Sequence, residues 1–231
     1  MKIDGKIIAH RGVFNNKDIP ENSLKAFNKA LRFNYPIELD IQLSKDNALV
    51  VFHDFRIDRM TKQKGYIQDM LFSEIENLKL LDTNEKIPRL EDVLELVKGK
   101  VLLDIEIKNT KRIKKTCQEL INLLNKYNYK NFIIKSFNPL IVKYLKDNYK
   151  NLEVGLLIND KYNNFFYNRL LKSNFIRKFC NCDFVAIHKE LLKNKKFISK
   201  LDSDILVYTI KTRDELIKEN NVINICNNLP Y

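Results

Sequence analysis

The sequence contains no tryptophan and only five glycines and five prolines among its 231 residues. So few turn formers leave no Gly- or Pro-rich tract of the kind that marks a linker. No stretch approaches the roughly 18 to 20 apolar residues of a membrane-spanning helix, and residues 1–6 lack the apolar core of a secretory signal. These absences predict one domain over residues 1–231, in the size range of a single α/β barrel, with a cytoplasmic location as the default.

Cysteine is also scarce, with four residues at positions 117, 180, 182 and 226. They form no pair of pairs with the spacing of a zinc site, and Cys180-Asn181-Cys182 is one residue short of a CxxC motif. We therefore expect reduced structural thiols rather than a metal or disulfide framework.

Positive charge is in excess, with a formal net charge of +12 that lies entirely in residues 111–231. Such an excess is explained either by attraction of an anionic substrate, membrane surface or polymer, or by lysines spread over exposed helix faces. We favour the second explanation, which leaves peripheral membrane contact through this basic half open. No short segment interleaves aromatic and basic side chains at a nucleic-acid-binding spacing, so no nucleic-acid partner is expected.

Apolar runs and amphipathic stretches alternate along the chain, which predicts parallel strands joined by helices. Strands are expected at 6–9, 37–43, 101–107, 131–135, 153–158, 183–187, 205–209 and 222–226. Helices are expected at 23–33, 90–97, 111–127, 139–148, 162–179, 189–200 and 212–219. Eight such units predict an α/β fold that closes into a (β/α)8 TIM-type barrel. An added strand at 50–52 and a small helix near 73–78 form an elaboration between barrel strands two and three.

Several predicted strands carry ionisable side chains on one face. Glu38 and Asp40 alternate with aliphatic residues, and Asp104, Glu106 and Lys108 repeat this pattern on the next barrel strand. In an exposed edge strand such a face would simply lie in water. In a barrel, the carboxylates would instead point inward and repel one another unless a cation compensated them. Oxygen ligands without a thiolate or histidine cluster favour a hard divalent cation, Mg²⁺ or Ca²⁺.

Short motifs at the expected ends of these strands occur in a specific order. They read His10-Arg11-Gly12, Pro20-Glu21-Asn22-Ser23, Glu38-Leu39-Asp40, Val50-Val51-Phe52-His53-Asp54, Ile87-Pro88-Arg89-Leu90 and Ile105-Glu106-Ile107-Lys108. Together they resemble the motifs of the glycerophosphodiester phosphodiesterase family, densely over residues 7–108 and more faintly afterwards at Ser136-Phe137 and Val207-Tyr208-Thr209.

The resemblance implies a metal-dependent hydrolase that converts glycerophosphodiesters to glycerol 3-phosphate and an alcohol, through a cyclic phosphate intermediate. Its roles carry over by motif. Glu38, Asp40 and Glu106 would hold one divalent cation, His10 and His53 would form the acid/base pair, Arg11 and Lys108 would bind the phosphate, and Glu21 would orient its neighbours. The resemblance does not decide which histidine is the acid. His188 is expected to be a loop residue, and Asp104 is placed equally well inside the barrel or at the cation.

Two departures from the family pattern concern the substrate rather than the chemistry. Tyr208 stands where the family usually has tryptophan, and Asn227-Asn228 stand where Thr-Asp is common. Two other functions therefore stay open. One is a phospholipase D-like enzyme of the same superfamily acting on lysophospholipids, and the other is a non-catalytic barrel that binds anionic lipids or polymers.

Overall fold

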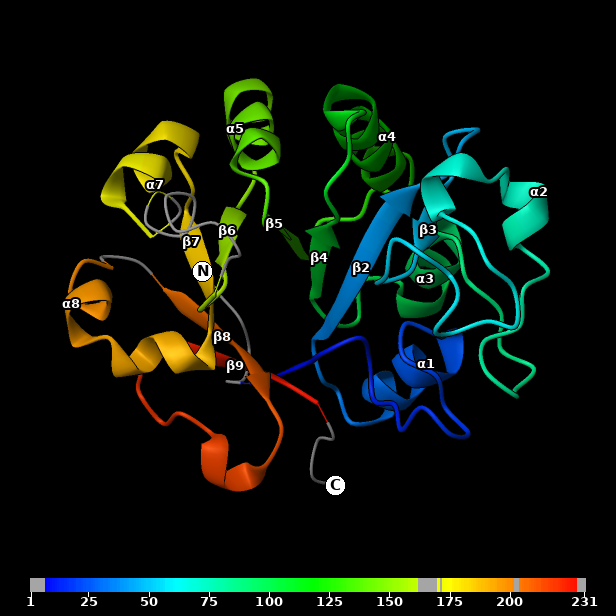
Figure 1. Ribbon diagram of the computed structural model, residues 1–231, viewed down its shortest axis with the longest axis horizontal. Coiled ribbons are helices and arrows are strands. Elements are labelled where there is room, and N and C mark those ends of the chain that lie inside the picture. The colour runs from blue at the N-terminus through cyan, green and yellow to red at the C-terminus, as the bar shows by residue number, and fades with distance from the viewer. Residues whose placement is uncertain (1–6, 162–169, 171, 202–203, 228–231) are drawn as a thin grey trace.

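The computed structural model describes residues 7–161, 170, 172–201 and 204–227 of the chain. Within this described part, one nine-stranded sheet follows the order β1-β9-β8-β7-β6-β5-β4-β2-β3, and pairing of β1 with β2 closes it into a barrel (Figure 1). The strands are β1 (Ile7–Ala9), β2 (Ile37–Leu43), β3 (Leu49–Val51), β4 (Leu103–Ile107), β5 (Phe132–Ser136), β6 (Val154–Ile158), β7 (Phe184–His188), β8 (Ile205–Ile210) and β9 (Val222–Cys226). All neighbours pair in parallel except β3, which runs antiparallel to β2.

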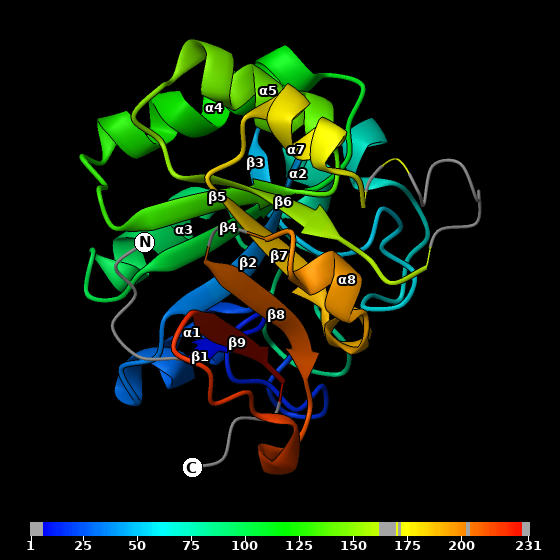
Figure 2. The ribbon, with the colours of Figure 1, turned by 90° about the vertical axis from the view of Figure 1, so that its left-hand side faces the viewer.

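Helices surround the barrel, as Figures 1 and 2 show from two directions. They are α1 (Leu24–Arg32), α2 (Phe72–Ile75), α3 (Leu90–Val97), α4 (Ile113–Lys126), α5 (Pro139–Asn148), α7 (Asn174–Cys180) and α8 (Lys195–Ile198), with 3-10 turns η1 (Ile67–Asp69), η2 (Lys189–Lys193) and η3 (Arg213–Glu215). The predicted TIM-type barrel is confirmed. None of the helices in the described part of the chain has the length and apolar character needed to cross a membrane.

Two apolar layers hold the strands in place. Outward-facing residues such as Ile37, Leu39 and Ile41 pack against the helices. A smaller cluster that includes Ile133, Leu157 and Phe184 belongs to a separate layer. The Phe184 ring occupies the space above Gly155, where a Cβ atom would lie only 2.1 Å from the ring. Because side chains along a strand alternate between its two faces, Glu38 and Asp40 lie on the face opposite to Ile37, Leu39 and Ile41.

The segment between β2 and α3 packs around its own apolar cluster. Residues 52–89 follow β3, and the side chains of Phe52, Ile57, Ile67 and Ile75 pack together in one buried cluster. This segment includes η1 and α2, where the expected helix at 73–78 is only the four residues Phe72–Ile75. Val50 of β3 and Phe52 belong to this cluster, and His53 follows them directly in the chain.

Several predicted helices differ from the observed ones. The expected helix at 212–219 is wrong, because only η3 forms and the Asn224 side chain instead bonds both the backbone N–H and C=O of Ile217. The expected helix at 189–200 is divided at Asn194, whose side chain caps α8. Of the expected helix at 162–179, residues 162–169 and 171 lie outside the described residues, and α7 begins after the capping residue Ser173.

Candidate active site

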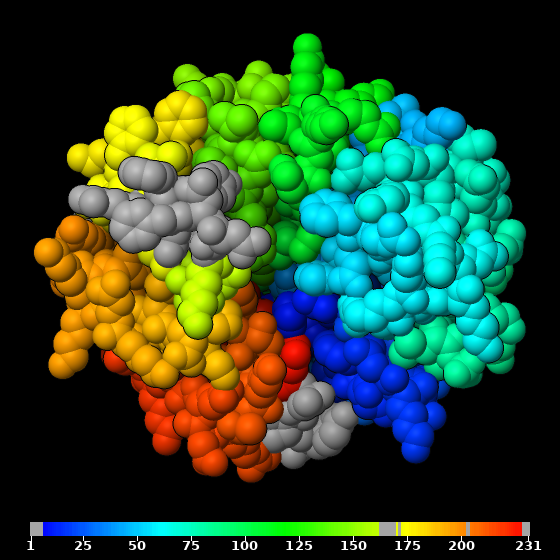
Figure 3. Space-filling model, in the orientation of Figure 1, coloured from blue at the N-terminus to red at the C-terminus, as the bar shows by residue number. Residues whose placement is uncertain are grey.

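A cavity of about 120 Å³ opens where the carboxyl ends of the barrel strands meet. It is lined by His10, Arg11, Glu38, His53, Glu106, Lys135, Phe137, Leu157, Tyr208, Thr209 and Ile225. Figure 3 shows a depression near the centre of this face, beside the blue segment that follows β1. Five of the eight residues predicted for the site line this cavity. The other three, Asp40, Lys108 and Glu21, each contact a residue that lines it.

The three carboxylates predicted to bind a cation lie together. Glu38, Asp40 and Glu106 each offer an oxygen, and these oxygens lie within 4.8 Å of one another. Parallel pairing of β2 with β4 produces this arrangement, because Glu38 faces Asp104 and Asp40 faces Glu106 in the sheet register. All three side chains are buried. Among the described residues, no other group of His, Cys, Asp and Glu side chains has this geometry.

The His10-Arg11-Gly12 turn aims backbone and side-chain donors at these carboxylates. Arg11 has φ of +55° and Gly12 has φ of +79°. A Cβ at Gly12 would lie 2.8 Å from the Ala26 backbone of α1, so only glycine lets the turn pack there. As a result the Arg11 backbone N–H donates to Glu38 Oε2 at 3.0 Å, and its Nε lies 3.5 Å from Asp40 Oδ2.

Glu21 contacts the Arg11 guanidinium. Its Oε1 accepts from Arg11 Nη1 at 2.7 Å and from Arg59 Nη2 at 2.6 Å, and its Oε2 accepts from Asn16. Burial disfavours its charge, yet the hydrogen bond from Arg59 and the charge of Arg11 lower the pKa of Glu21 to about 2. Glu21 is therefore an ionised, nearly fully buried carboxylate at neutral pH.

Asn22 and Arg59 were not predicted for the site, although Asn22 lies within one of the motifs. The Asn22 side-chain amide donates to Asp40 Oδ2 at 2.9 Å. Arg59 lies in the segment after β3, from which it reaches both Glu21 and Asp54. Only the fold brings this segment beside the turn after β1, so no sequence spacing indicated that Arg59 belongs here.

Two lysines neutralise part of the acidic cluster. Lys108 Nζ lies 2.7 Å from Glu106 Oε1 and 3.3 Å from Asp40 Oδ1. Burial opposes its charge, but Glu106 and Asp40 hold the pKa of Lys108 above its usual value. Burial likewise opposes ionisation of Asp40, yet Lys108, His53 and Arg11 hold its pKa well below the usual range.

Lys135 is a second buried cation at the site, and the sequence prediction missed it. Its Nζ lies 2.5 Å from Asp104 Oδ2 and 3.2 Å from Glu38 Oε1. Although burial acts in the opposite direction, Asp104 and Glu38 raise the pKa of Lys135. Asp104 thus lies inside the barrel against a lysine and outside the carboxylate group described above. A charged residue directly after the apolar run Phe132-Ile133-Ile134, inside the predicted strand, was the available signal.

The two predicted catalytic histidines have different partners. His10 Nδ1 lies 2.5 Å from Asn227 Oδ1, while its Nε2 is 3.9 Å from Glu38 Oε2. Burial, reinforced by the charge of Arg11, lowers the pKa of His10 to about 3. His53 Nδ1 instead lies 2.6 Å from Asp54 Oδ1, a carboxylate that Arg59 also contacts. The structure thus pairs one imidazole with an amide and the other with an acid.

Other residues considered from the sequence lie outside the cavity or at its edge. His188 ends β7, where its Nδ1 is 3.5 Å from Asp160 Oδ1, and it does not line the cavity. Tyr208 does line it, with its hydroxyl donating to the Ile158 carbonyl at 3.0 Å. Asn227 contacts His10, whereas Asn228 lies outside the described residues. Of the residues that depart from the family pattern, Tyr208 therefore lines the cavity and Asn227 contacts a histidine that lines it.

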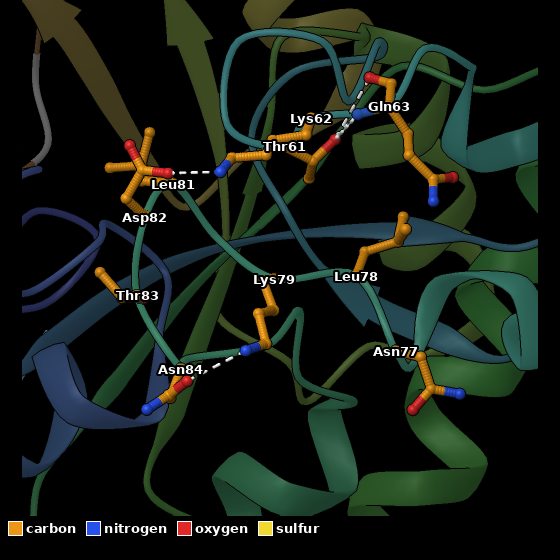
Figure 4. A pocket seen from close by; sticks show the side chains of 10 residues that line it. All are labelled: Thr61, Lys62, Gln63, Asn77, Leu78, Lys79, Leu81, Asp82, Thr83 and Asn84. Atoms are coloured by element: carbon orange, nitrogen blue, oxygen red, sulfur yellow. Dashed lines mark hydrogen bonds and ion pairs between the residues drawn. The ribbon is translucent and has the colours of Figure 1, made fainter.

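A second cavity of about 300 Å³ lies in the segment that follows β3, and Figure 4 shows its lining. The side chains there include the ion pair of Lys62 with Asp82, which are 82% and 85% exposed. Lys79 donates to Asn84 across the same hollow. Neither a histidine nor a buried carboxylate lines this cavity, so its chemistry does not match that of a catalytic site.

The donor set of the first cavity fits a hard cation. Three buried carboxylates supply only oxygen ligands, which Mg²⁺ and Ca²⁺ prefer. Three carboxylates buried beside one another are costly unless positive charge compensates them. A divalent cation held by Glu38, Asp40 and Glu106 would supply the missing positive charge.

Comparisons with known proteins agree with this geometry. The sequence matches the Glycerophosphoryl diester phosphodiesterase family over residues 10–223. It is 38% identical over 161 residues to a glycerophosphodiester phosphodiesterase of Caldanaerobacter subterraneus, a match that spans 65% of each chain. It is 28% identical over 220 residues to a putative glycerophosphodiester phosphodiesterase of Bacillus subtilis, which covers 92% of this chain and 88% of the relative.

Solved structures share the fold. A glycerophosphodiester phosphodiesterase from Parabacteroides distasonis superposes with a TM-score of 0.79 at 24% identity, covering 97% of this chain and 93% of that one. A phosphodiesterase from Oleispira antarctica, solved with the product sn-glycerol-3-phosphate, gives a TM-score of 0.78 at 20% identity over 96% and 92% of the two chains. At these sequence identities the superpositions show only that the fold is shared, whereas the sequence match over residues 10–223 shows family membership. The chain therefore belongs to the glycerophosphoryl diester phosphodiesterase family.

Proposed function

We propose that this protein hydrolyses glycerophosphodiesters to glycerol 3-phosphate and an alcohol, with the help of one divalent cation. The observation that carries the proposal is that three convergent carboxylates, two imidazoles and the cations Arg11 and Lys108 lie together in and around one small cavity. Membership of the family supports the reaction class, and the product-bound relative supports a small phosphodiester as substrate.

Glu38, Asp40 and Glu106 would hold the cation, either Mg²⁺ or Ca²⁺. When bound, the cation would offset negative charge on the phosphoryl oxygens and help to orient the substrate. Arg11 and Lys108 border the same carboxylates and would bind the remaining phosphoryl oxygens. Glu21 and Arg59 would keep the Arg11 guanidinium in place, because Glu21 accepts hydrogen bonds from both arginines.

His10 is suited to the role of general base. In the hydrogen bond to Asn227, Nδ1–H donates to the amide oxygen, so the neutral ring keeps its lone pair on Nε2. Burial and the charge of Arg11, which lower the pKa of His10 to about 3, favour the neutral ring that can accept a proton and also make it a weaker base than a free imidazole. His10 Nε2 would then take the proton from the attacking hydroxyl.

His53 is suited to the role of general acid. Asp54 Oδ1 lies 2.6 Å from its Nδ1 and holds the ring in one orientation. The imidazolium would deliver a proton to the leaving alkoxide oxygen. Attack by the neighbouring glycerol hydroxyl would give a cyclic phosphate and release the alcohol. In the second step the roles would be exchanged: His53 would take a proton from water, and His10 would return its proton to the glycerol oxygen as the cyclic phosphate opens.

A substrate panel tests this proposal. The purified chain, stripped of metal and then supplied with Mg²⁺ or Ca²⁺, is incubated with glycerophosphocholine, glycerophosphoethanolamine and lysophosphatidylcholine, and glycerol 3-phosphate and free alcohol are quantified. Turnover of the water-soluble diesters supports the proposal. Turnover of the lysolipid alone would indicate a phospholipase D-like enzyme, and lipid binding without turnover by any substrate would indicate a non-catalytic barrel.

A further inference from the structure

Lys135 occupies a position that the proposed reaction does not use. It lies on β5 with only 1% of its side chain exposed, and it lines the cavity. Its Nζ contacts two carboxylates at once, Asp104 Oδ2 at 2.5 Å and Glu38 Oε1 at 3.2 Å. Sheet register places Lys135 beside Glu106 of β4.

The contact with Glu38 leaves that carboxylate held from both sides. Its Oε2 accepts from the Arg11 backbone N–H, and its Oε1 faces the Lys135 ammonium. A side chain with several rotatable bonds is thereby held in one orientation, next to the oxygens of Asp40 and Glu106. Arg11 can hold only one of the two Glu38 oxygens by this bond, so Lys135 supplies the second restraint.

The charges of the buried cluster nearly balance without an added ion. Four carboxylates lie there: Glu38, Asp40, Asp104 and Glu106. Three cationic side chains contact them: Arg11, Lys108 and Lys135. Removal of Lys135 would leave two carboxylates close together with one cation fewer, a costly arrangement in a buried site.

We propose that Lys135 is a positioning residue that fixes Glu38 and supplies positive charge to the carboxylate cluster. The cluster then keeps its shape when no cation is bound, but it binds a cation less tightly than the same carboxylates would without Lys135. This inference rests on the cation site of the proposed function. Lys135 and a cation bound by Glu38 would share one carboxylate and repel each other. Lys135 thus raises the stability of the protein without a cation and lowers its affinity for the cation.

The test measures cation binding rather than turnover. Lys135→Met removes the charge and keeps a long apolar side chain in the barrel. After removal of metal, binding of Mg²⁺ and of Ca²⁺ is measured by calorimetry, together with thermal unfolding in EDTA and in excess ion. We expect the variant to melt at a lower temperature in EDTA, to bind the ion about tenfold more tightly, and to gain more stability from the ion than the unsubstituted protein.

Lys146→Met is the matched control. Lys146 is also buried, and its Nζ pairs with Asp183 at 2.8 Å, but it lies on α5 and does not line the cavity. We expect this control to lose stability and to keep the cation affinity of the unsubstituted protein. A structural role alone would make Lys135→Met behave in the same way.

A second pair of variants covers the case in which Lys135→Met does not fold. Asp104→Asn is compared with Asp104→Asn/Lys135→Met, which has the formal charge of the unsubstituted protein. The proposal again requires about tenfold tighter ion binding when Lys135 is removed from this background. Equal or weaker binding in both comparisons would overturn it. If the unsubstituted protein bound neither ion, the cation site itself would be wrong, which is a distinct failure.

Discussion

Glu21 offers a stability prediction that depends on a single buried carboxylate. It is 5% exposed and accepts hydrogen bonds from Arg11, Arg59 and Asn16. Against the opposing effect of burial, these partners lower its pKa to about 2 from an ordinary value of 4.5. At about 1.4 kcal/mol for each pH unit, this depression corresponds to about 3 kcal/mol of stability at neutral pH. Because Arg59 is 46% exposed, screening by solvent makes that figure an upper bound.

The sign of the pH dependence follows from the lowered pKa. A folded-state value below the unfolded one means that the stabilisation is fully present above about pH 4.5 and disappears as the pH falls towards 2. We therefore expect Glu21→Gln to reduce the free energy of unfolding by about 2 to 3 kcal/mol at pH 7. The difference from the unsubstituted protein should shrink steadily below pH 4.5.

Urea unfolding at pH 7, 5, 4 and 3 measures this difference. Asp82→Asn is the control, because Asp82 forms an ion pair with Lys62 but is 85% exposed, and we expect little change from it at any pH. A Glu21→Gln deficit that stayed constant from pH 7 to 3 would show that the ionised carboxylate is not the source of the stabilisation.

Three further predictions concern the site and the barrel. His10→Ala and His53→Ala should each reduce turnover of a glycerophosphodiester by about 10² to 10⁴ fold while circular dichroism stays unchanged; near-normal rates would refute their acid/base roles. Glu106→Gln should abolish the rise in melting temperature that Mg²⁺ or Ca²⁺ gives the metal-free protein, and an undiminished rise would place the cation elsewhere. Gly155→Ala should cost about 1 to 3 kcal/mol or more in urea unfolding, because its Cβ would overlap the Phe184 ring; Phe184→Leu in the same chain should recover part of the loss.

The barrel was predictable because periodicity and burial agree along its strands. Glu38 and Asp40 alternate with Ile37, Leu39 and Ile41, and that two-residue period fixes which side chains point inward once the sheet closes. The expected helix at 212–219 was wrong for a tertiary reason. The side chain of Asn224, which lies seven residues further along in β9, bonds the backbone N–H and C=O of Ile217, and the apolar pattern of residues 212–219 does not encode this contact.

The site was predictable to the extent that its residues follow strands in recognisable motifs. Lys135 was missed because a lysine as the last residue of a predicted strand is consistent with exposure at the strand end, whereas the register places it beside Glu106 inside the barrel. Arg59 was missed because it reaches Glu21 across 38 residues of sequence. Asn227 was noted only as a departure from the family pattern, although it is the partner of His10.

The most direct measurement is a ³¹P NMR time course of glycerophosphoethanolamine with the metal-free protein, before and after addition of Mg²⁺ or Ca²⁺. We predict no change in the substrate signal in EDTA, and its conversion to glycerol 3-phosphate once the ion is present. Conversion at the same rate in EDTA, or a substrate signal unchanged with either ion, would contradict hydrolysis assisted by a cation on Glu38, Asp40 and Glu106.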